Sequence, residues 1–354
     1  MTAPIAPGVL ARRVVAWQQQ HGRNHLPWQN TQDPYRVWLS EVMLQQTQVA
    51  TASGYFNRFV ARLPTLQHLA DASLDEVLGL WSGLGYYSRA RNLHRCARTV
   101  VLQHAGVFPR SAEVLETLPG IGRSTAAAIA SLCFGQRVAI LDANVKRVVA
   151  RVVGFDGDLA LAAQQRALWD AATALLPSAK DAPKAMARYT QGMMDLGATV
   201  CLPKTPLCGV CPLKSDCEAH AEGEPQRYPV RSRRLKRSSQ SLWLLWVRTS
   251  DGAVWLSKRP TPGVWAALHC LPLFESEAAL HAAVPARWQA QLEPLPAFLH
   301  VLTHKDLHLH PWRLDLAGQE SLGDVGGSWV AAQRWPDLGL PAPIRKLLDQ
   351  SGSQ

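Results

Sequence analysis

The spacing of apolar residues changes once along this chain, and the change divides it into two parts. From Val9 to about Val200, apolar side chains recur at the intervals of amphipathic helices, with breaks at Pro, Gly and Asp. Later this period changes, and SLWLLWVRTSDGAVWLSKR (residues 241–259) predicts two strands around the turn Ser250-Asp251-Gly252. FLHVLTHKDLHLHPWRLDL (residues 298–316) predicts one or two more strands. The sequence therefore predicts a mostly α domain followed by a smaller α+β domain.

A basic segment separates the two parts. EGEPQRYPVRSRRLKRS (residues 222–238) holds two prolines and six Lys or Arg, and few apolar residues, which is typical of a linker. We therefore place the first domain at residues 1–221 and the second at residues 239–350. A chain of 354 residues with 47% apolar content has enough material for two packed cores.

Charge and composition narrow the class of protein. The chain carries 37 Lys and Arg against 27 Asp and Glu, a formal net charge of +10. This excess favours polyanionic partners such as nucleic acid, although solvated basic faces produce the same excess. No apolar run has the length of a membrane span, and no secretory signal precedes the helical pattern. We expect a cytoplasmic, monomeric protein that associates with the nucleoid through DNA.

Four of the seven cysteines gather in one short loop, CLPKTPLCGVCPLKSDC (residues 201–217). Cys201, Cys208, Cys211 and Cys217 are spaced C-x₆-C-x₂-C-x₅-C, which in a reducing compartment indicates a metal site rather than disulfides. Four thiolates hold either tetrahedral zinc or a cubane iron–sulfur cluster, and the spacing alone does not choose between them. The three scattered cysteines are predicted to be buried thiols.

Glu41 is the one charged residue in VWLSEVMLQQTQV (residues 37–49). An ionised carboxylate buried without a partner is expensive, so Glu41 either faces solvent or has its pKa raised for a purpose.

Two further segments suggest a DNA site. A predicted helix over Arg123–Phe134 follows Leu118-Pro119-Gly120-Ile121-Gly122, which is a helix-hairpin-helix pattern. Its glycines and the free N–H groups of the helix start suit the binding of one phosphate, although a plain helix C-cap turn has a similar composition. In LDANVKRVVARVVG, Asp142 stands where a helix begins, which fits an N-cap residue and is compatible with a catalytic one.

Taken together, VWLSEVMLQQTQV, WSGLGYYSRARN, LPGIGRSTAAAI, ILDANVKRV and the cysteine loop resemble the helix-hairpin-helix DNA glycosylases with a [4Fe–4S] cluster. They are most similar to the MutY family, the adenine DNA glycosylases that remove adenine mispaired with 8-oxoguanine in base excision repair. The resemblance implies a [4Fe–4S] cluster on the four cysteines and duplex DNA carrying adenine opposite 8-oxoguanine or guanine as the partner.

The resemblance also implies the catalytic roles. Glu41 would protonate the departing adenine, because a Glu in an apolar pocket retains its proton near neutral pH. Asp142, ionised by helix N–H groups, would stabilise the positive charge that develops on the sugar, directly or as a transient covalent partner. Asn144 matches a residue that hydrogen-bonds near this centre.

Ser124 stands where related endonuclease III-type enzymes carry the lysine that forms a Schiff base. The substitution implies a monofunctional glycosylase that leaves an abasic site, with Lys146 the nearest candidate for any weak lyase activity. Gly120, Gly122 and Ser124 belong to the hairpin that would contact DNA.

Other matches concern extrusion of the base from the duplex. Gln46 and Tyr86 match residues that insert into the base stack, and Trp28 matches the wall of the adenine pocket, although a solvated Gln, a core Tyr and a packing Trp are the structural alternatives. Arg89, Arg91 and Arg95 would touch phosphate or cover a helix face.

The second domain resembles the Nudix-like domain of MutY proteins, which inspects 8-oxoguanine. GVWAALHCLPLFE (residues 263–275) is similar to its G-x-W-x-x-L…P signature, with Ala267 where Gly is common. FESEAALHAAV (residues 274–284) lacks the acidic array that holds magnesium in Nudix hydrolases, so we expect no nucleotide hydrolysis. In LTHKD (residues 302–306), Thr303 and His304 match the loop that recognises the oxidised base.

Rivals remain. Thymine-mismatch and oxidised-pyrimidine glycosylases share the fold but generally lack a second domain. A catalytically silent mismatch-binding or iron–sulfur redox protein would not need both Glu41 and Asp142.

Overall fold

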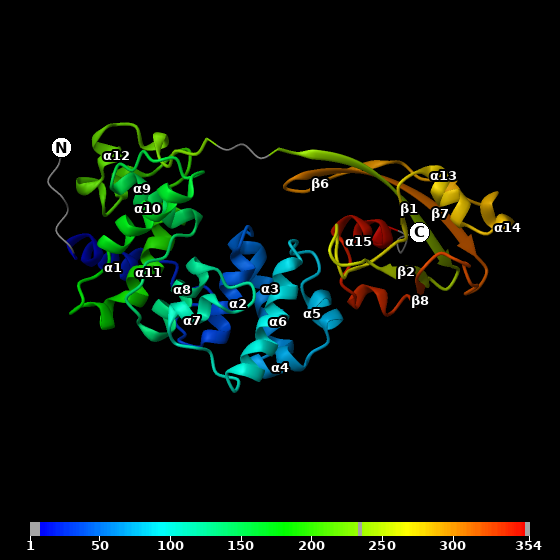
Figure 1. The fold of residues 1–354 in the computed structure, drawn as a ribbon, viewed down its shortest axis with the longest axis horizontal. Coiled ribbons are helices and arrows are strands. Elements are labelled where there is room, and N and C mark those ends of the chain that lie inside the picture. The colour runs from blue at the N-terminus through cyan, green and yellow to red at the C-terminus, as the bar shows by residue number, and fades with distance from the viewer. Residues whose placement is uncertain (1–7, 233–235, 351–354) are drawn as a thin grey trace. The chain divides into compact units, whose positions relative to one another are not determined.

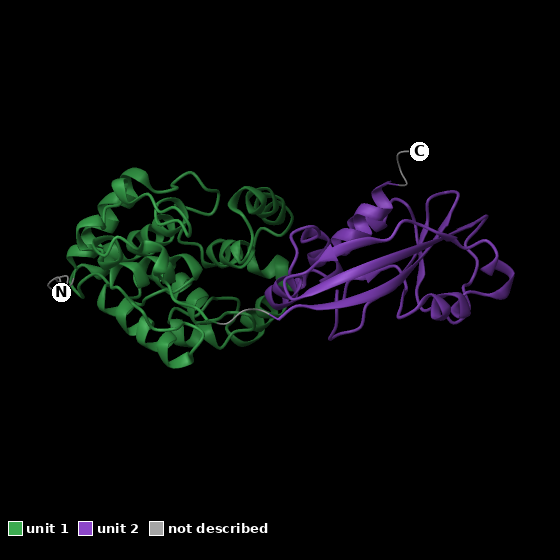
Figure 2. Ribbon diagram, turned by 90° about the horizontal axis from the view of Figure 1, so that it is seen from above, with its two compact units in different colours: residues 1–70, 95–233 green, residues 71–94, 234–354 purple. Residues whose placement is uncertain are grey.

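A computed structural model of the chain describes residues 8–232 and 236–350 (Figure 1). It consists of two compact units, residues 1–70 with 95–233 and residues 71–94 with 234–354 (Figure 2). The first seven residues of the expected helical domain and residues 233–235 of the expected linker lie outside the described residues. In the described parts of the chain, no helix combines the length and the apolar character that crossing a membrane requires.

The first unit is helical, as the apolar spacing predicts. Its helices are α1 (Val9–His21), α2 (Pro34–Leu44), α3 (Val49–Arg62), α7 (Ala112–Glu116), α8 (Arg123–Phe134), α9 (Ala143–Val152), α10 (Ala162–Ala174), α11 (Ala182–Thr199) and α12 (Glu218–Ala221), with α4 (Leu66–Asp71) at its boundary. Short 3₁₀ turns follow in the cysteine loop and after it: η1 (Cys208–Val210), η2 (Lys214–Asp216) and η3 (Pro225–Arg227).

Local sequence explains where these helices begin. Asp33 caps α2 by accepting a hydrogen bond of 2.9 Å from the Tyr35 N–H, and Pro34 supplies a first residue that needs no donor. The expected helix over Arg123–Phe134 is confirmed as α8, and Asp142 is the N-cap of α9.

The core of this unit depends on close helix packing. The buried cluster takes apolar side chains from α1, α8, α9, α10 and α11. At Gly192 of α11, an added Cβ would lie 2.7 Å from Val14 Cγ1 and 3.2 Å from the Val14 carbonyl oxygen, so α1 and α11 approach more closely than a larger residue permits.

The second unit is built on a mixed sheet. Its strands are β1 (Ser238–Thr249), β2 (Val254–Lys258), β3 (His269–Cys270), β4 (Leu273–Phe274), β5 (Glu293–Pro294), β6 (Phe298–Val301), β7 (Lys305–Leu316) and β8 (Ser328–Val330). Its helices are α5 (Leu74–Leu80), the start of α6 (Ser88–Gln103), α13 (Glu277–Ala283), α14 (Ala286–Gln289) and α15 (Ala342–Asp349), with the turn η4 (Trp335–Asp337).

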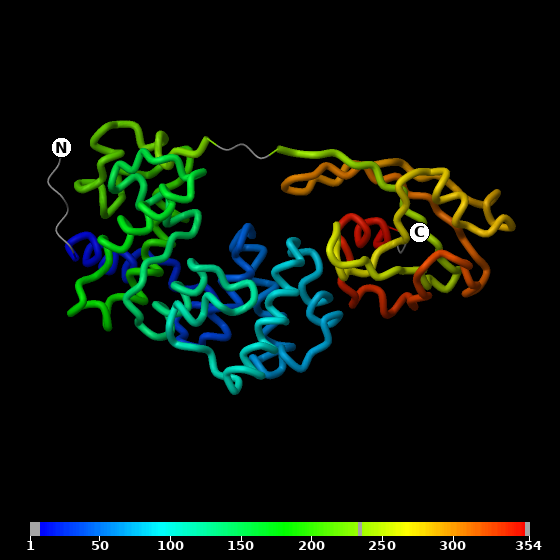
Figure 3. The backbone as a smooth tube through the Cα atoms, viewed as in Figure 1, coloured from blue at the N-terminus to red at the C-terminus, as the bar shows by residue number. Residues whose placement is uncertain are grey.

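The longest pairing in this sheet joins β1 and β7, which run parallel from Ser238 opposite Lys305 to Thr249 opposite Leu316 (Figure 3). The predicted hairpin at residues 250–252 is confirmed, because β1 and β2 pair antiparallel, and the two predicted later strands are β6 and β7. One apolar cluster packs the sheet against α15, and a second packs it against α13.

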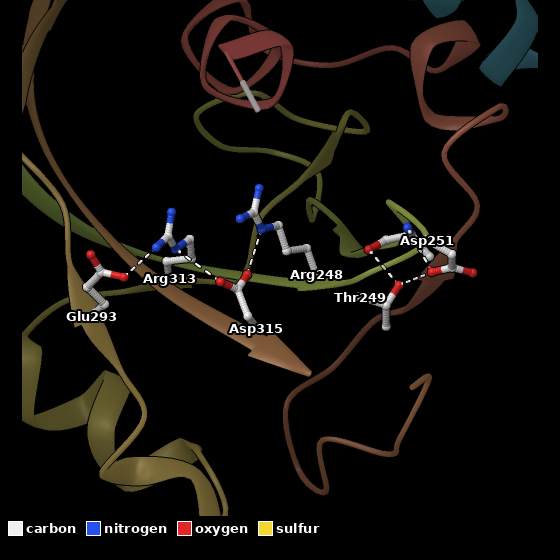
Figure 4. Close-up of polar contacts among 7 residues, drawn as sticks. Arg248, Thr249, Asp251, Glu293, Arg313 and Asp315 are labelled. Atoms are coloured by element: carbon white, nitrogen blue, oxygen red, sulfur yellow. Dashed lines mark hydrogen bonds and ion pairs between the residues drawn. The ribbon is translucent and has the colours of Figure 1, made fainter. Parts of the chain in front are cut away.

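Polar contacts fix the end of this long pairing (Figure 4). Arg248 of β1 donates from Nε to Asp315 of β7 over 2.6 Å, and these two residues are direct partners in the register. Arg313 forms ion pairs with Glu293 of β5 and with Asp315. At the turn, the Thr249 hydroxyl donates to Asp251. The charged ladder therefore ties β1, β7 and β5 together, and an Asx-type turn leads into β2.

The close packing at Gly192 makes a stability prediction. We expect Gly192→Ala to lower the free energy of unfolding by about 1–3 kcal/mol, because the new Cβ overlaps α1. Gly54→Ala in α3 is the matched control: nothing lies within 4 Å of its Cβ position, so alanine should stabilise the helix by roughly 0.5–1 kcal/mol. Chemical denaturation of the full chain, followed by circular dichroism, measures both. Equal effects of the two substitutions would contradict this account.

Candidate active site

Glu41 lies on α2 between the buried side chains of Ser40 and Val42. Burial, and to a smaller extent the negative charge of Asp142, raise the pKa of its carboxyl group from 4.5 to about 7. The positive charge of Arg23 acts in the opposite direction. Glu41 is therefore the kind of carboxylic acid that keeps its proton near neutral pH, which is the second of the two alternatives that the sequence left open.

Asp142 holds the start of α9. Its Oδ1 accepts a 2.6 Å hydrogen bond from the Val145 N–H. Burial raises the pKa of Asp142, while bonds from backbone N–H groups and the charges of Arg147 and Lys146 lower it. Burial prevails and the pKa of Asp142 is raised, but Asp142 has backbone donors and basic neighbours that favour its ionised form, whereas Arg23 alone acts in that direction on Glu41.

Asn144 lies in the first turn of the same helix and is hydrogen-bonded to Arg147. The Arg147 Nη2 donates to Asn144 Oδ1 over 2.9 Å and to the Gly197 carbonyl over 2.5 Å, and its Nε donates to the Cys201 carbonyl over 2.7 Å. An added Cβ at Gly197 would lie 2.7 Å from Asn144 Cβ, so the glycine lets α11 pass directly against Asn144. The carboxylate end of α9 is thus connected to the cysteine loop through one arginine.

A polar groove of about 740 Å³ opens beside Trp28. It is lined by the loop after α1, the end of α8 and the start of α11, and Gln29, Cys133 and Gln191 are among its walls. Trp28 is buried and packs edge-on against Phe56 with ring centroids 5.4 Å apart. The charge of Glu41 contributes to the raised pKa of the Cys133 thiol, which brings the groove wall and the carboxyl group into one region.

The two residues expected to enter the base stack share an unusual backbone. Gln46, just after α2, has φ 57°, and Tyr86 has φ 49°; both are exposed, Tyr86 to 43%. Non-glycine residues in this left-handed region are uncommon and concentrate at functional positions. Gln46 belongs to the first unit and Tyr86 to the second, and each is described within its own unit.

Arg89 supports the turn that presents Tyr86. Its guanidinium is buried and donates to the carbonyls of Leu84 over 3.3 Å and Gly85 over 3.0 Å. Arg91 donates to the Ala266 carbonyl over 2.8 Å within the same unit. These two arginines therefore bind backbone, whereas the sequence left open phosphate contact or coverage of a helix face.

The expected hairpin is formed between α7 and α8. Gly120 has φ 76°, a conformation that suits glycine, and the Ile121 N–H donates to the Leu118 carbonyl over 3.1 Å. Gly122 is the N-cap of α8 and, having no side chain, leaves the first N–H groups of the helix without a side-chain cap in the described structure. Ser124 lies in the first turn of α8 and is partly exposed.

The cysteine loop encloses a small cavity of about 30 Å³, whose walls include Cys201, Cys208, Cys211 and Cys217 among apolar side chains. Burial, and to a smaller extent the charges of the other three cysteines, raise the pKa of Cys211 to about 11, so the four sulfurs are electrostatic neighbours. Arg151 is buried beside them and donates to Cys201 Sγ over 3.3 Å. Over residues 8–232 and 236–350, no three His, Cys, Asp or Glu side chains are arranged to hold a single metal ion.

Four sulfurs with a cationic donor in an apolar shell fit the donor set of an iron–sulfur cluster. The fit rests on the chemistry of the residues that line the cavity.

The loop that is expected to recognise the oxidised base (residues 302–306) connects β6 and β7 of the second unit. Thr303 and His304 are exposed at its tip, and the Leu302 N–H donates to the Lys305 carbonyl over 2.8 Å. The hydroxyl groups of Tyr86 and Thr303 are 2.6 Å apart, within the same unit. His310 of β7 stacks on Trp243 of β1 with ring centroids 4.6 Å apart.

Comparisons with known proteins decide the family. Residues 39–171 match the HhH-GPD superfamily of base excision DNA repair proteins, and residues 243–350 match the NUDIX domain. The adenine DNA glycosylase of Buchnera aphidicola subsp. Acyrthosiphon pisum is 34% identical over 96% of this chain and 97% of that protein. This chain belongs to the adenine DNA glycosylase family. It is a DNA glycosylase enzyme with the expected fold of a helical domain followed by a Nudix-like domain.

Two further comparisons describe how widely the family and the fold are shared. The adenine DNA glycosylase of Rattus norvegicus is 34% identical over 95% of this chain and 76% of that protein. A thermostable thymine-DNA glycosylase of known structure aligns with a TM-score of 0.52 and 26% identity, over 60% of this chain and 96% of the other. The helical glycosylase fold is thus shared with an enzyme whose name gives a different base.

The structure adds residues for which the sequence held no local signal. Gln29 lines the groove, and Arg23 pairs with Asp195, from which it is separated by 172 positions in the sequence. Gln29 follows Trp28 directly and could have been suspected from that position alone.

The raised pKa of Glu41 predicts the pH dependence of base excision. If protonated Glu41 is the acid, activity is complete below its folded-state pKa of about 7 and falls as the pH rises through that value. Single-turnover excision rates measured across pH give the midpoint, with DNA binding measured in parallel to remove effects on affinity. A midpoint near 4.5, the ordinary value for this group, would show that Glu41 is not held protonated.

Proposed function

We propose that this enzyme flips adenine out of duplex DNA where it is mispaired with 8-oxoguanine or guanine, and hydrolyses its glycosidic bond in base excision repair. The observation that carries the proposal is the pair Glu41 and Asp142: burial raises the pKa of both carboxyl groups, that of Glu41 to about 7, and only Asp142 has helix N–H donors and basic neighbours that favour its ionised form. Relatives named adenine DNA glycosylases over nearly the whole chain support the choice of base.

The reaction follows from this pair. Glu41 donates its proton to a ring nitrogen of adenine while the bond between the base and the sugar breaks and its electron pair leaves with the base. The positive charge left on the deoxyribose faces the carboxylate of Asp142, which stabilises it until water adds. Asn144, held by Arg147, completes the polar end of α9.

The flipped base would occupy the groove beside Trp28. Both polar atoms of the Gln29 carboxamide are buried without a hydrogen-bond partner among the described residues. An unpartnered buried amide costs about 1–3 kcal/mol, and a carboxamide is the side chain that pairs with the donor and acceptor edge of adenine. The groove thus offers a flat apolar wall and an amide that lacks a partner.

Extrusion of the base requires a residue to fill the gap in the stack. Gln46 and Tyr86 are exposed in strained backbone conformations that present their side chains outward, which supports this role. The uncapped start of α8 after Gly120 and Gly122 supports binding of one DNA phosphate, with Ser124 in the same turn.

Recognition of 8-oxoguanine is assigned to the loop that carries Thr303 and His304. The exposed hydroxyl and imidazole groups supply polar contacts, and the hydrogen bond between Tyr86 and Thr303 joins the proposed wedge to this loop. Leu302 stands where this loop carries a Phe in well-known MutY proteins. The hydroxyl groups of Tyr86 and Thr303 would therefore carry more of the recognition in this chain.

We also assign a [4Fe–4S] cluster to Cys201, Cys208, Cys211 and Cys217. When bound, the cluster supplies a covalent brace for the loop and takes no part in breaking the glycosidic bond. Arg151 would compensate the negative charge of the thiolates, since it already donates to Cys201 Sγ. The site residues of α9 would in turn be steadied through Arg147 and the Cys201 carbonyl.

Single-turnover excision on four duplexes tests the proposed substrate. We expect release of adenine opposite 8-oxoguanine and guanine, and no release of adenine opposite thymine or of thymine opposite guanine. Glu41→Gln should reduce excision by at least about 10²-fold while binding to the mispaired duplex is retained, because the amide has no proton to give. Thymine release would move the enzyme to the mismatch specificity named for its structural neighbour.

The same reactions distinguish a monofunctional enzyme from a lyase. With Ser124 in place of a lysine, borohydride should trap little covalent adduct on the mispaired duplex. A strong adduct in the wild type that disappears in Lys146→Gln would contradict the monofunctional assignment and identify the amine.

Metal content tests the cofactor. Purified protein should contain iron and acid-labile sulfide in equal amounts, and Cys208→Ser should lose both together with folding of the loop. Stoichiometric zinc without sulfide would replace the cluster by the tetrahedral alternative.

A further inference from the structure

Residues 71–94 follow the first helices in the sequence but pack with the C-terminal residues, in the same compact unit (Figure 2). The segment carries α5, the turn after it and the first residues of α6. Two glycines bring α5 against its neighbour in this unit. An added Cβ at Gly79 would overlap the Asp337 carbonyl oxygen, and one at Gly339 would lie 2.6 Å from Leu78 Cβ. The backbone of α5 and the chain at the end of η4 are therefore in direct contact.

Polar side chains fasten the turn after α5 to the same neighbour. The Tyr87 hydroxyl donates to the Leu340 carbonyl over 2.7 Å and accepts a hydrogen bond of 3.2 Å from the Gly83 N–H. It therefore joins the turn to a residue that is fully buried in the apolar cluster between the sheet and α15. The Ser82 hydroxyl also donates to the Leu340 carbonyl, over 3.4 Å, and accepts a hydrogen bond of 3.0 Å from Arg345 Nε of α15.

Arg345 holds the segment that receives the turn. Its Nη2 donates to the carbonyl groups of Pro336 over 2.9 Å and of Leu338 over 2.8 Å, while its Nε binds Ser82. Because the donors of a guanidinium form one rigid fork, these contacts cannot shift independently of one another. The anchor of the turn is therefore a fixed point of the second unit.

The same turn also contacts the loop that is expected to recognise the oxidised base. Tyr86 has φ 49°, and its hydroxyl oxygen lies 2.6 Å from that of Thr303. Since Tyr86 and Tyr87 are adjacent, their hydroxyl groups join two separate parts of the second unit, the loop after β6 and the segment before α15. Further along, Arg91 of α6 donates to the Ala266 carbonyl over 2.8 Å. The turn is thus held from more than one side by residues of this unit.

We propose that Tyr87 is a positioning residue for selectivity toward 8-oxoguanine: its hydroxyl holds the Tyr86 turn in a fixed place beside the loop of Thr303, so that wedge and loop meet DNA as one body. This inference rests on the proposed function, in which Tyr86 enters the base stack and the Thr303 loop contacts the oxidised base. Without the anchor, turn and loop must be ordered relative to each other during binding, and the free energy of that ordering is lost from the complex. The loss falls on the complex that uses both elements, which is the one with 8-oxoguanine.

Removal of single hydroxyl groups tests the proposal through a ratio of rates. The selectivity ratio is the single-turnover rate of adenine excision opposite 8-oxoguanine divided by the rate opposite guanine, both measured with the full chain below saturation. Tyr87→Phe keeps the ring and should lower this ratio by about 3- to 10-fold, the range expected for the loss of one or two hydrogen bonds. The rate opposite guanine should change by less than about twofold. Ser82→Ala removes the other hydroxyl on the Leu340 carbonyl and should lower the ratio in the same direction.

Tyr228→Phe is the matched control. Tyr228 is buried in the first unit, and its hydroxyl donates to Glu222 over 2.8 Å. This variant therefore loses a tyrosine hydroxyl of the same kind away from the turn, and the selectivity ratio should stay at its wild-type value. Circular dichroism confirms that each variant is folded.

A double-mutant cycle with Thr303→Ala separates positioning from general stability. If Tyr87 acts by fixing the Tyr86 turn beside Thr303, the two substitutions are not additive. Once Thr303 has been replaced, Tyr87→Phe should change the selectivity ratio by less than about twofold. A residue that only stabilises the fold would lower the ratio by the same factor in both backgrounds.

The outcomes are distinct. A lower ratio in Tyr87→Phe and Ser82→Ala that disappears in the Thr303→Ala background supports the proposal. An unchanged ratio, equal losses on the two duplexes, or additive effects would overturn it and leave the anchor a purely structural one. If the wild type releases no adenine from either duplex, the proposed function fails. If the wild type prefers 8-oxoguanine and Tyr87→Phe keeps that preference, only this inference fails.

Discussion

Two carboxyl groups in one poorly solvated region cannot both be ionised cheaply, and the rest of this site follows from that constraint. Asp142 is the group whose charge is supported, since helix N–H groups and two basic neighbours favour its ionised form. Burial of Glu41 and the negative charge of Asp142 then raise the pKa of Glu41 from 4.5 to about 7, which favours its protonated form. That shift corresponds to roughly 3 kcal/mol in favour of the protonated acid, a large free energy for one side chain to draw from its surroundings. The fold must hold the two groups together against this repulsion.

Helix α9 fixes the position of Asp142. Asp142 caps it, Asn144 lies in its first turn, and Arg147 and Arg151 fasten its far side to the cysteine loop. The glycine at position 197 lets α11 lie against this turn, and the same helix carries Asp195, which fixes Arg23. Glu41, Asp142 and Arg23 are therefore attached to elements that pack on one another, and hydrogen bonds through Arg147 connect the cysteine loop to the first turn of α9.

Much of this arrangement could be predicted from the sequence, for physical reasons that are local. The helical period, the start of α8 after Gly122 and the cap at Asp142 depend on residues a few positions apart, and the structure confirms them. The hairpin after β1 could be predicted equally well, because the residues that form its turn are three adjacent positions in the sequence. In contrast, the parallel pairing of β1 with β7 joins segments 67 residues apart, as in Ser238 with Lys305, and the sequence of neither strand indicates which strand it pairs with. The ion pair between Arg23 and Asp195 could not be predicted for the same reason. Arg89 and Arg91 bind backbone carbonyl groups that no spacing rule identifies.

The exposed residues follow a different logic from the buried ones. Gln46 and Tyr86 hold backbone conformations that cost free energy in the isolated protein, and the surrounding contacts must sustain them. For Tyr86 the support is visible: Arg89 is buried beneath the turn, Trp81 donates to the Gly85 carbonyl, and Thr303 bonds the phenol. If such a side chain enters a base stack, as proposed, it loses little further entropy, because part of the cost of ordering it is already met in folding. The backbone strain at Gln46 and Tyr86 and the raised pKa of Glu41 are both present in the isolated protein, and different residues sustain them.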